Sequence, residues 1–141
     1  MYYTGGRDVF GDNIPKTMDG RAFEKHVAQI LRENKCEVNE QASIGFKFKN
    51  HKHKIDCLVN GDTLVSIKWQ QTGGTTEEKV GYEMWTLHQM TLHYTKAYII
   101  CGGPGWTIFE NLLKMSKDYP KVTLIRYEDD ETLSFINGHR K

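Results

Sequence analysis

Apolar residues recur along the chain at spacings that predict a series of helices and strands. The first helical stripe follows Asp19, a residue suited to cap a helix, and starts at Phe23 with further apolar residues four, seven and eight positions on. This spacing predicts a helix over about 20–34. The next stretch, 36–50, alternates as a strand does and is broken by Gly45.

Residues 54–71, KIDCLVNGDTLVSIKWQQ, contain two apolar runs separated by an Asn-Gly dipeptide. This dipeptide favours the turn of a hairpin. Polar residues interrupt both runs, at Asp56 in the first and at Ser66 and Lys68 in the second. A hairpin that only filled a core would carry apolar or uncharged side chains at these positions, so the three residues require another reason.

The rest of the chain alternates between helical and strand patterns. A helix of about four turns is expected from Thr75, where acidic residues in the first turn favour the helix dipole. The apolar run 96–103 predicts a buried strand, and the segment WTIFENLLKMSKDY predicts a helix that Pro120 ends. Residues 121–127 read as a further strand, and 128–141 as an acidic turn with a final short strand or tail.

The order of these elements predicts an α/β fold of three layers, in which helices flank a central mixed sheet. Strict alternation of strand and helix, as in a doubly wound nucleotide-binding fold, is excluded by the hairpin. We expect an irregular N-terminal arm over residues 1–18 and one domain over residues 19–141.

Composition narrows the class of protein. A chain of 141 residues is the size of one domain, and its apolar fraction of 38% and charged fraction of 26% are typical of soluble proteins. No apolar run approaches the roughly 20 residues that span a bilayer, and the N-terminus lacks a signal pattern, so we expect a cytoplasmic protein without a membrane partner. Cys36, Cys57 and Cys101 are far apart and are expected to be buried free thiols.

The net charge is only +1, but the positive charge is unevenly distributed. The segment FKFKNHKHK, residues 46–54, carries six basic or imidazole side chains and no acid. Such a strip can neutralise DNA phosphates, although a lysine-protected hairpin edge would look the same. The candidate DNA-binding residues are Lys47, Lys49, His51, Lys52, His53 and Lys54.

The register of the hairpin decides which polar side chains can meet. With a two-residue turn, Asp56 points away from Lys68. With a three-residue loop, Val59 faces Thr63, Asp56 pairs with Ser66, and residue 54 pairs with Lys68. Asp56, Ser66, Lys68 and Gln70 then share one face, and we favour this register because it makes the polar residues converge.

A carboxylate beside an ammonium group suggests chemistry more than stability. Surface ion pairs contribute about 0–1 kcal/mol, and buried pairs are often no better than apolar replacements. A carboxylate at Asp56 can instead hold Mg²⁺, and Lys68 can orient or deprotonate a water and stabilise charge on a phosphoryl group. The backbone carbonyl of Ile67 could add a metal ligand.

This arrangement resembles the PD-(D/E)XK nuclease superfamily. The resemblance rests on Glu24 in GRAFEKHVAQIL, Asp56 in KIDCLV and Lys68 in VSIKWQ. It implies that Glu24 and Asp56 bind metal, that Lys68 positions the attacking water, and that Gln70 assists. The longer phrase SIKWQQTGGTTEEKVGYE is similar to phage, restriction-type and homing endonucleases of this superfamily, which also implies a phage-encoded protein that acts in a host cell.

Ser66 departs from the family pattern, because the motif has a carboxylate at that position. The missing ligand can come from elsewhere in the chain, or the Ser66 hydroxyl can bind metal through water. In a third interpretation the chain has lost catalysis and only binds DNA. The candidate replacements are Gln70 on the same strand and Glu77, Glu78 and Glu83 on the following helix.

The sequence therefore predicts a Mg²⁺-dependent endonuclease, with Mn²⁺ as a substitute, that hydrolyses phosphodiester bonds in double-stranded DNA. A homing-type or restriction-type role is the expected setting. Because a small subunit with one site cuts both strands most simply as a symmetric assembly, a homodimer or higher homo-oligomer is expected. The alternatives are a non-catalytic DNA-binding relative and a Holliday-junction-resolving enzyme.

Overall fold

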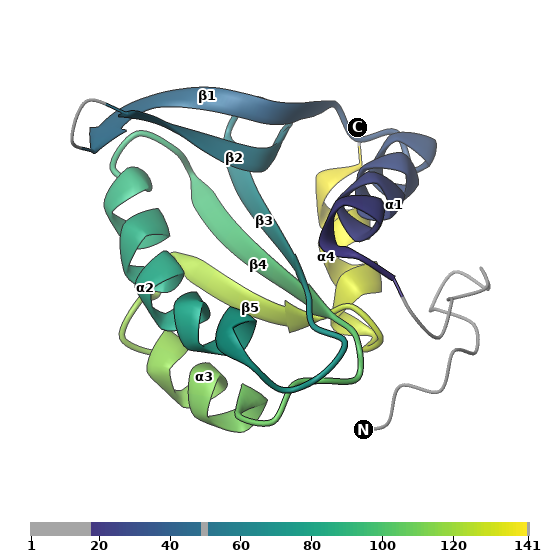
Figure 1. The fold of residues 1–141 in the computed structure, drawn as a ribbon. Helices are drawn as coiled ribbons and strands as arrows, with labels where there is room; N and C mark the ends of the chain where they lie inside the picture. The colour runs from purple at the N-terminus through teal and green to yellow at the C-terminus, as the bar shows by residue number, and fades with distance from the viewer. Residues whose placement is uncertain (1–17, 49–50, 141) are drawn as a thin grey trace.

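The computed structural model describes residues 18–48 and 51–140. Five strands form one sheet in the order β1-β2-β3-β4-β5, with helices on both sides (Figure 1). Along the described chain the elements are α1 (Gly20–Glu33), β1 (Val38–Phe48), β2 (His51–Val59), β3 (Thr63–Trp69), α2 (Thr75–Met90), β4 (Lys96–Gly102), α3 (Phe109–Ser116), β5 (Val122–Arg126) and α4 (Glu131–His139).

The sheet is mixed, as the order of predicted elements indicates. Strands β1, β2 and β3 are antiparallel neighbours, whereas β3, β4 and β5 run parallel. Parallel neighbours need a crossover, and α2 and α3 supply the two crossovers. The sheet therefore changes from antiparallel to parallel at β3, the strand that carries Ser66 and Lys68.

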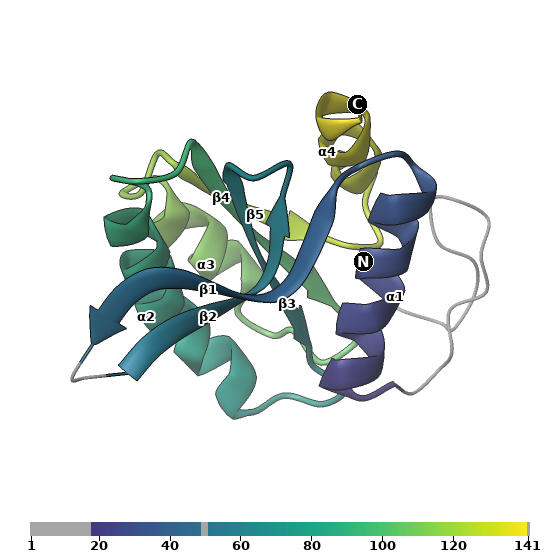
Figure 2. The ribbon, with the colours of Figure 1, turned by 90° about the horizontal axis from the view of Figure 1, so that it is seen from above.

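Two helices cover each face of the sheet. α1 and α4 lie on one face, and α2 and α3 lie on the other (Figures 1 and 2). Alternate residues of β3 pack on opposite faces of the sheet. Val65 and Ile67 pack in the core under α1 and α4, and Leu64 packs in the core under α2 and α3. This pattern confirms the predicted three-layer α/β fold and places β3 between α1 and α2.

The hairpin between β2 and β3 has the three-residue loop. Val59 pairs with Thr63 and Leu58 with Leu64, as the favoured register requires. Asn60 and Gly61 adopt left-handed φ angles of 55° and 76°, which Asn and Gly tolerate better than other residues. The local sequence thus sets the register on which the candidate site depends.

The C-terminal prediction was wrong, because residues 131–139 form the helix α4. Thr132, Phe135 and Ile136 are buried at helical spacing and pack this helix against the sheet. The Thr132 hydroxyl donates to the backbone oxygens of Arg126 and Tyr127, which ties the first turn of the helix to the end of β5. Short length and a mixed pattern hid this helix in the sequence.

Other sequence predictions can be compared with the described chain. Cys36, Cys57 and Cys101 are free and buried, as expected. No helix in residues 18–48 and 51–140 is long and apolar enough to cross a membrane. The predicted N-terminal arm, apart from its last residue, lies outside the described residues.

Candidate active site

Strands β2 and β3 separate near Asp56, and this fork organises the site. Their pairing in the described chain runs from the hairpin as far as Cys57 and Val65. Beyond it, the Asp56 carboxylate accepts a hydrogen bond of 2.7 Å from the backbone N–H of Ile67. The predicted pairs of Asp56 with Ser66 and of Lys54 with Lys68 are therefore wrong, because a side chain replaces the main-chain partner on β3.

Glu24 reaches the fork from α1. The preceding residue, Phe23, is buried and packs its ring 5.1 Å from that of Trp69, which fixes this turn of the helix against β3. Glu24 is then positioned to hydrogen-bond with Asp56. Burial and, next, the neighbouring Asp56 carboxyl group raise the pKa of Glu24 to about 8, so Glu24 keeps its proton at neutral pH.

A carboxyl pair that retains a proton offers the oxygen donors that a divalent cation would use in place of that proton. No three His, Cys, Asp or Glu side chains in the described residues are grouped as a metal site. Two carboxylates supplemented by a backbone oxygen and waters fit Mg²⁺, which keeps several waters in its shell. Ile67, whose carbonyl is the predicted additional ligand, lines a cavity together with Glu24.

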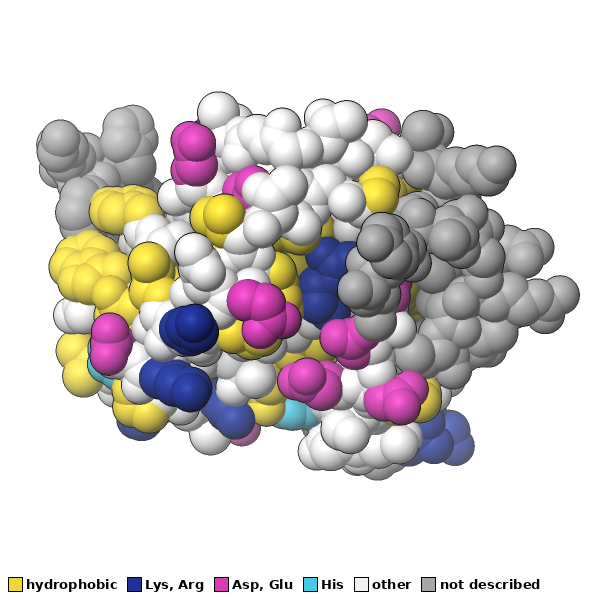
Figure 3. All heavy atoms as spheres, turned by 90° about the horizontal axis from the view of Figure 1, so that it is seen from below, with side chains coloured by type: hydrophobic (Ala, Val, Ile, Leu, Met, Phe, Trp, Pro, Cys, Tyr) yellow, Lys and Arg dark blue, Asp and Glu magenta, His cyan; other side chains and the backbone are white. Residues whose placement is uncertain are grey.

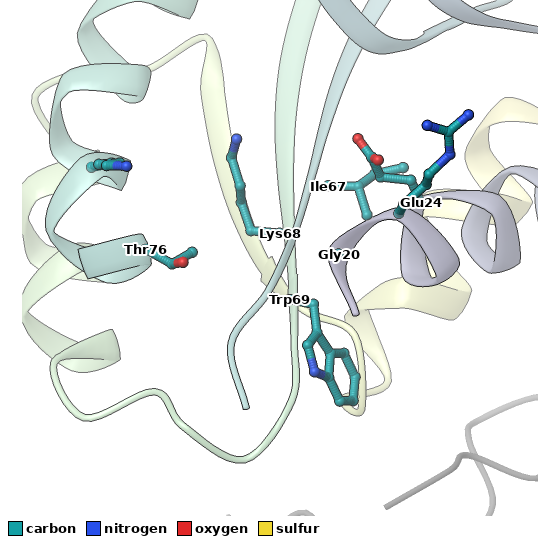
Figure 4. Close-up of a pocket in the computed structure, with 8 residues that line it drawn as sticks. Gly20, Glu24, Ile67, Lys68, Trp69 and Thr76 are labelled. Carbon is teal, nitrogen blue, oxygen red and sulfur yellow. The ribbon is translucent and has the colours of Figure 1, made fainter. Parts of the chain in front are cut away.

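Lys68 lies between Glu24 on α1 and Thr76 on α2 (Figure 4). Its ammonium nitrogen is 2.8 Å from Oε2 of Glu83 on α2. Burial alone would lower the pKa of Lys68, but the carboxylates of Glu83, Asp56 and Glu24 raise it above its ordinary value. Lys68 is therefore a cation at neutral pH, able to donate hydrogen bonds and to stabilise negative charge.

Glu83 also contacts Ser66, the residue that departs from the family motif. The Ser66 hydroxyl donates a hydrogen bond of 2.9 Å to Oε1 of Glu83, and only 1% of Ser66 is exposed. The small side chain leaves room for a carboxylate that arrives from the facing helix. Among the candidate replacements, Glu83 is the one that the structure brings beside both Ser66 and Lys68.

Gln70 and Glu77 form a different, buried network. The Gln70 amide donates to the backbone oxygen of Gly105 at 2.8 Å and accepts from the backbone N–H of Glu77 at 3.0 Å. The Glu77 carboxylate accepts bonds from Thr107 and Ile108 before α3. Burial alone would raise the pKa of Glu77, but these hydrogen bonds hold it below its ordinary value.

These contacts direct Gln70 and Glu77 to the loops before α2 and α3. Glu78 is exposed on α2. In the part of the chain that the structure describes, no hydrogen bond or ion pair joins any of the three to Glu24 or Asp56. Their predicted roles as a catalytic assistant or replacement ligands thus lack a contact with the carboxyl pair.

Most of the predicted DNA-binding strip falls outside what can be described. The backbone of β1 and β2 is described up to the gap at 49–50, but the side chains of residues 45–53 are not. The Lys54 side chain is exposed. The DNA-binding role predicted for five residues therefore falls on side chains outside the described part of the structure: Lys47, Lys49, His51, Lys52 and His53.

A cavity of about 340 Å³ opens beside the fork, between α1 and α2 (Figure 4). Its lining includes two basic side chains, Arg21 and Lys79, which are not among the site residues expected from the sequence. Helical spacing could have indicated Lys79, since Thr76, Lys79 and Glu83 share one face of α2. The residues around the cavity are Gly20, Arg21, Glu24, Ile67, Lys68, Trp69, Thr76 and Lys79.

Comparison with known proteins agrees with this geometry. A family model described as a PD-(D/E)XK nuclease superfamily domain matches residues 6–126. No curated protein and no solved structure shows a significant match to the chain. The matched region includes α1, the fork of β2 and β3, and α2, which supply the carboxyl pair, the lysine and the additional glutamate. The chain therefore belongs to the PD-(D/E)XK nuclease superfamily.

Proposed function

We propose that the chain is a Mg²⁺-dependent endonuclease that hydrolyses phosphodiester bonds in double-stranded DNA. The observation that carries the proposal is the meeting of Glu24, Asp56 and Lys68 at the fork of β2 and β3. These groups come from three different elements, α1, β2 and β3, and the fold brings them together. Membership of a nuclease superfamily supports hydrolysis as the reaction.

Glu24 and Asp56 would hold the metal, with the carbonyl of Ile67 as a further ligand. Oxygen donors of this kind suit Mg²⁺, and Mn²⁺ would be a functional substitute. When bound, the ion supplies a Lewis acid that neutralises charge on a phosphoryl oxygen. The carboxylates contribute by fixing that charge at the fork, where Asp56 is itself held by the Ile67 N–H.

Lys68 would orient the attacking water and stabilise the phosphoryl oxygens. Because its pKa lies above the ordinary value, Lys68 acts as a hydrogen-bond donor and not as the base. The water oxygen forms a bond to phosphorus and gives up a proton to solvent, while the bond from phosphorus to the leaving sugar oxygen breaks and that oxygen takes a proton from a solvent water. We assign Glu83 the role of a positioning residue, because its carboxylate, on α2, lies 2.8 Å from the Lys68 ammonium nitrogen.

A homodimer would let two copies of this site cut both DNA strands. Support comes from exposed apolar side chains on α2, α3 and the segment after α2, and hydrophobic groups gather on the α2 and α3 side of the molecule (Figure 3). Tyr82 and Trp85 are 62% and 39% exposed and stack on one another. Aromatic side chains of this kind are enriched at protein interfaces. Light scattering should give a dimer that Trp85→Ser weakens; a wild-type monomer at assay concentrations contradicts this part.

A homing-type or restriction-type role would require cleavage at specific sites. The similarity of SIKWQQTGGTTEEKVGYE to such endonucleases supports this assignment. Sequencing the ends of cleaved plasmid or genomic DNA tests it directly. Ends that share one sequence support site-specific cleavage, whereas random ends contradict it.

Nicking of supercoiled plasmid DNA tests the catalytic proposal. We expect cleavage with Mg²⁺ or Mn²⁺, none with EDTA, and none from Lys68→Ala, which should still bind duplex DNA. Lys114→Ala, an exposed lysine on α3, is the matched control. Binding without cleavage under any divalent metal would refute the enzyme and favour the non-catalytic alternative. Preference for four-way junctions over linear duplex would instead identify a junction-resolving enzyme.

A further inference from the structure

The cavity between α1 and α2 carries an excess of positive charge. Its lining contains three cations, Arg21, Lys68 and Lys79, and one carboxyl group, Glu24. The other lining residues are Gly20, Ile67, Trp69 and Thr76 (Figure 4). A cavity of about 340 Å³ with this balance of charge suits an anion.

A second cavity adjoins the first and has the opposite character. It measures about 580 Å³ and is lined by three acidic residues, Glu24, Glu40 and Asp56, together with Arg21 and Lys25. The two cavities share Arg21 and Glu24. The protein thus separates an acidic compartment, which contains the proposed metal-binding pair, from a cationic compartment beside α2.

Two of the three cations in the first cavity are available to a ligand. Lys68 is paired with Glu83 at 2.8 Å. Arg21 and Lys79 form no ion pair within the described residues, and both side chains are exposed. A bound anion would therefore gain two charge contacts without breaking an existing one.

The start of α2 adds to the attraction for an anion. Thr76 lines the cavity, and the N-cap residue of α2, Gly74, makes no side-chain cap. The first turn holds two acids: Glu77 is occupied by hydrogen bonds from Thr107 and Ile108, and Glu78 is exposed. N–H groups at a helix start attract phosphate. The backbone N–H of Glu77 is already bound by Gln70, so the helix start adds only the N–H groups that precede Glu77 to the two cationic side chains.

We propose that Arg21, Lys79 and the first turn of α2 form a subsite for a DNA backbone phosphate that neighbours the scissile phosphate on the same strand. The inference rests on the proposed function, since the scissile phosphate is assigned to the carboxyl pair at Glu24 and Asp56. The shared wall at Glu24 places the two compartments next to one another. The ligand class is the phosphodiester monoanion, read without regard to base sequence.

Salt-dependent binding tests the subsite without requiring cleavage. Affinity for a fluorescent 30-bp duplex is measured in EDTA over a range of salt concentrations. Each of Arg21→Ala and Lys79→Ala should lower the slope of log affinity against log salt by about one and weaken binding roughly tenfold, uniformly across sequences. Lys79→Arg should retain most of the affinity, and Lys114→Ala should match the wild type. Unchanged slopes in both alanine variants would overturn the proposal.

Modified DNA then locates the phosphate. After the wild-type cut site is mapped, single methylphosphonates, which lack the negative charge, are placed on either side of it. Lys79→Ala should raise KM roughly tenfold on normal DNA with kcat nearly unchanged, and should have no further effect when the contacted phosphate is already neutral. Equal losses on every modified duplex would overturn the assignment. Reduced salt slopes in a protein that cuts no DNA would refute the nuclease and leave the phosphate site standing.

Discussion

Glu83 offers the sharpest test of how this chain compensates for the serine in its motif. Its two carboxylate oxygens have separate partners: Oε1 accepts from Ser66 at 2.9 Å, and Oε2 lies 2.8 Å from the Lys68 ammonium. Glu83→Gln preserves the shape of the side chain and removes its charge. Lys68 then loses its closest carboxylate while keeping the cost of partial burial.

The expected loss of stability follows from the exposure of the pair. The side chains of Lys68 and Glu83 are 29% and 19% exposed, which lies between a surface pair and a buried one. Breaking a surface pair costs about 0–1 kcal/mol, and breaking a buried one about 3–5 kcal/mol. We expect Glu83→Gln to lower the free energy of unfolding by about 2 kcal/mol, or the Tm by roughly 6 °C.

Cleavage should fall further than stability alone explains. Without Glu83 the ammonium of Lys68 loses the contact that orients it, so kcat should drop by about 10²-fold in the temperature range where the variant is folded. Urea unfolding and single-turnover plasmid nicking measure the two effects. Glu78→Gln, on the exposed face of the same helix, is the matched control.

A rescue variant separates charge from shape. Adding Ser66→Asp to Glu83→Ala returns a carboxylate to the strand beside Lys68 and should recover part of the lost cleavage. If Glu83→Gln keeps both the wild-type unfolding midpoint and the wild-type cleavage rate, the role assigned to Glu83 is refuted.

Three further predictions concern titration and backbone packing. Glu77→Gln should lower the free energy of unfolding by about 2 kcal/mol at neutral pH. Because hydrogen bonds hold the folded-state pKa of Glu77 below its ordinary value of 4.5, the wild-type advantage is present above pH 4.5 and is lost as the pH falls through the folded-state pKa. Urea unfolding at several pH values measures this loss. In EDTA, the wild type should lose stability as pH rises from 4.5 to about 8, because the folded state keeps the Glu24 proton that the unfolded state releases; a Glu24→Gln variant with the same pH dependence would contradict this. Gly103→Ala should destabilise by about 2–4 kcal/mol, since its φ is +105° and a Cβ would lie 2.4 Å from the backbone oxygen of Gln70. Gly138→Ala, a helical position with open space, should instead stabilise by about 0.5–1 kcal/mol in thermal unfolding, and equal effects of the two substitutions would argue against the packing explanation.

Local sequence patterns determined much of the fold. The stripe from Phe23 predicted α1, which ends at Glu33 close to the expected position, and the acids after Thr75 predicted the start of α2. Asn60 and Gly61 favoured a tight turn between β2 and β3. These features depend on residues a few positions apart, so their physics is visible in a short window of sequence.

The same local reasoning failed where packing between distant segments decides. α4 forms because Phe135 and Ile136 find an apolar surface on the sheet, which the nine residues of the helix do not reveal by themselves. The Asp56 side chain takes the place of a main-chain partner because β2 and β3 diverge there. A hairpin register extrapolated from the loop could not include that fork.

The sequence by itself therefore determined which chemistry the chain carries: a carboxylate and a lysine on adjacent strands, an acid on the first helix, and a serine where the family motif has a carboxylate. Only the tertiary structure selected Glu83, among several possible replacements, as the partner of Ser66 and Lys68. That choice depends on how α2 is rotated about its axis, which the burial of Val80, Met84 and Leu87 against the sheet fixes. Rotation of a helix is a property of the packed core, whereas the identity of its residues is a property of the chain.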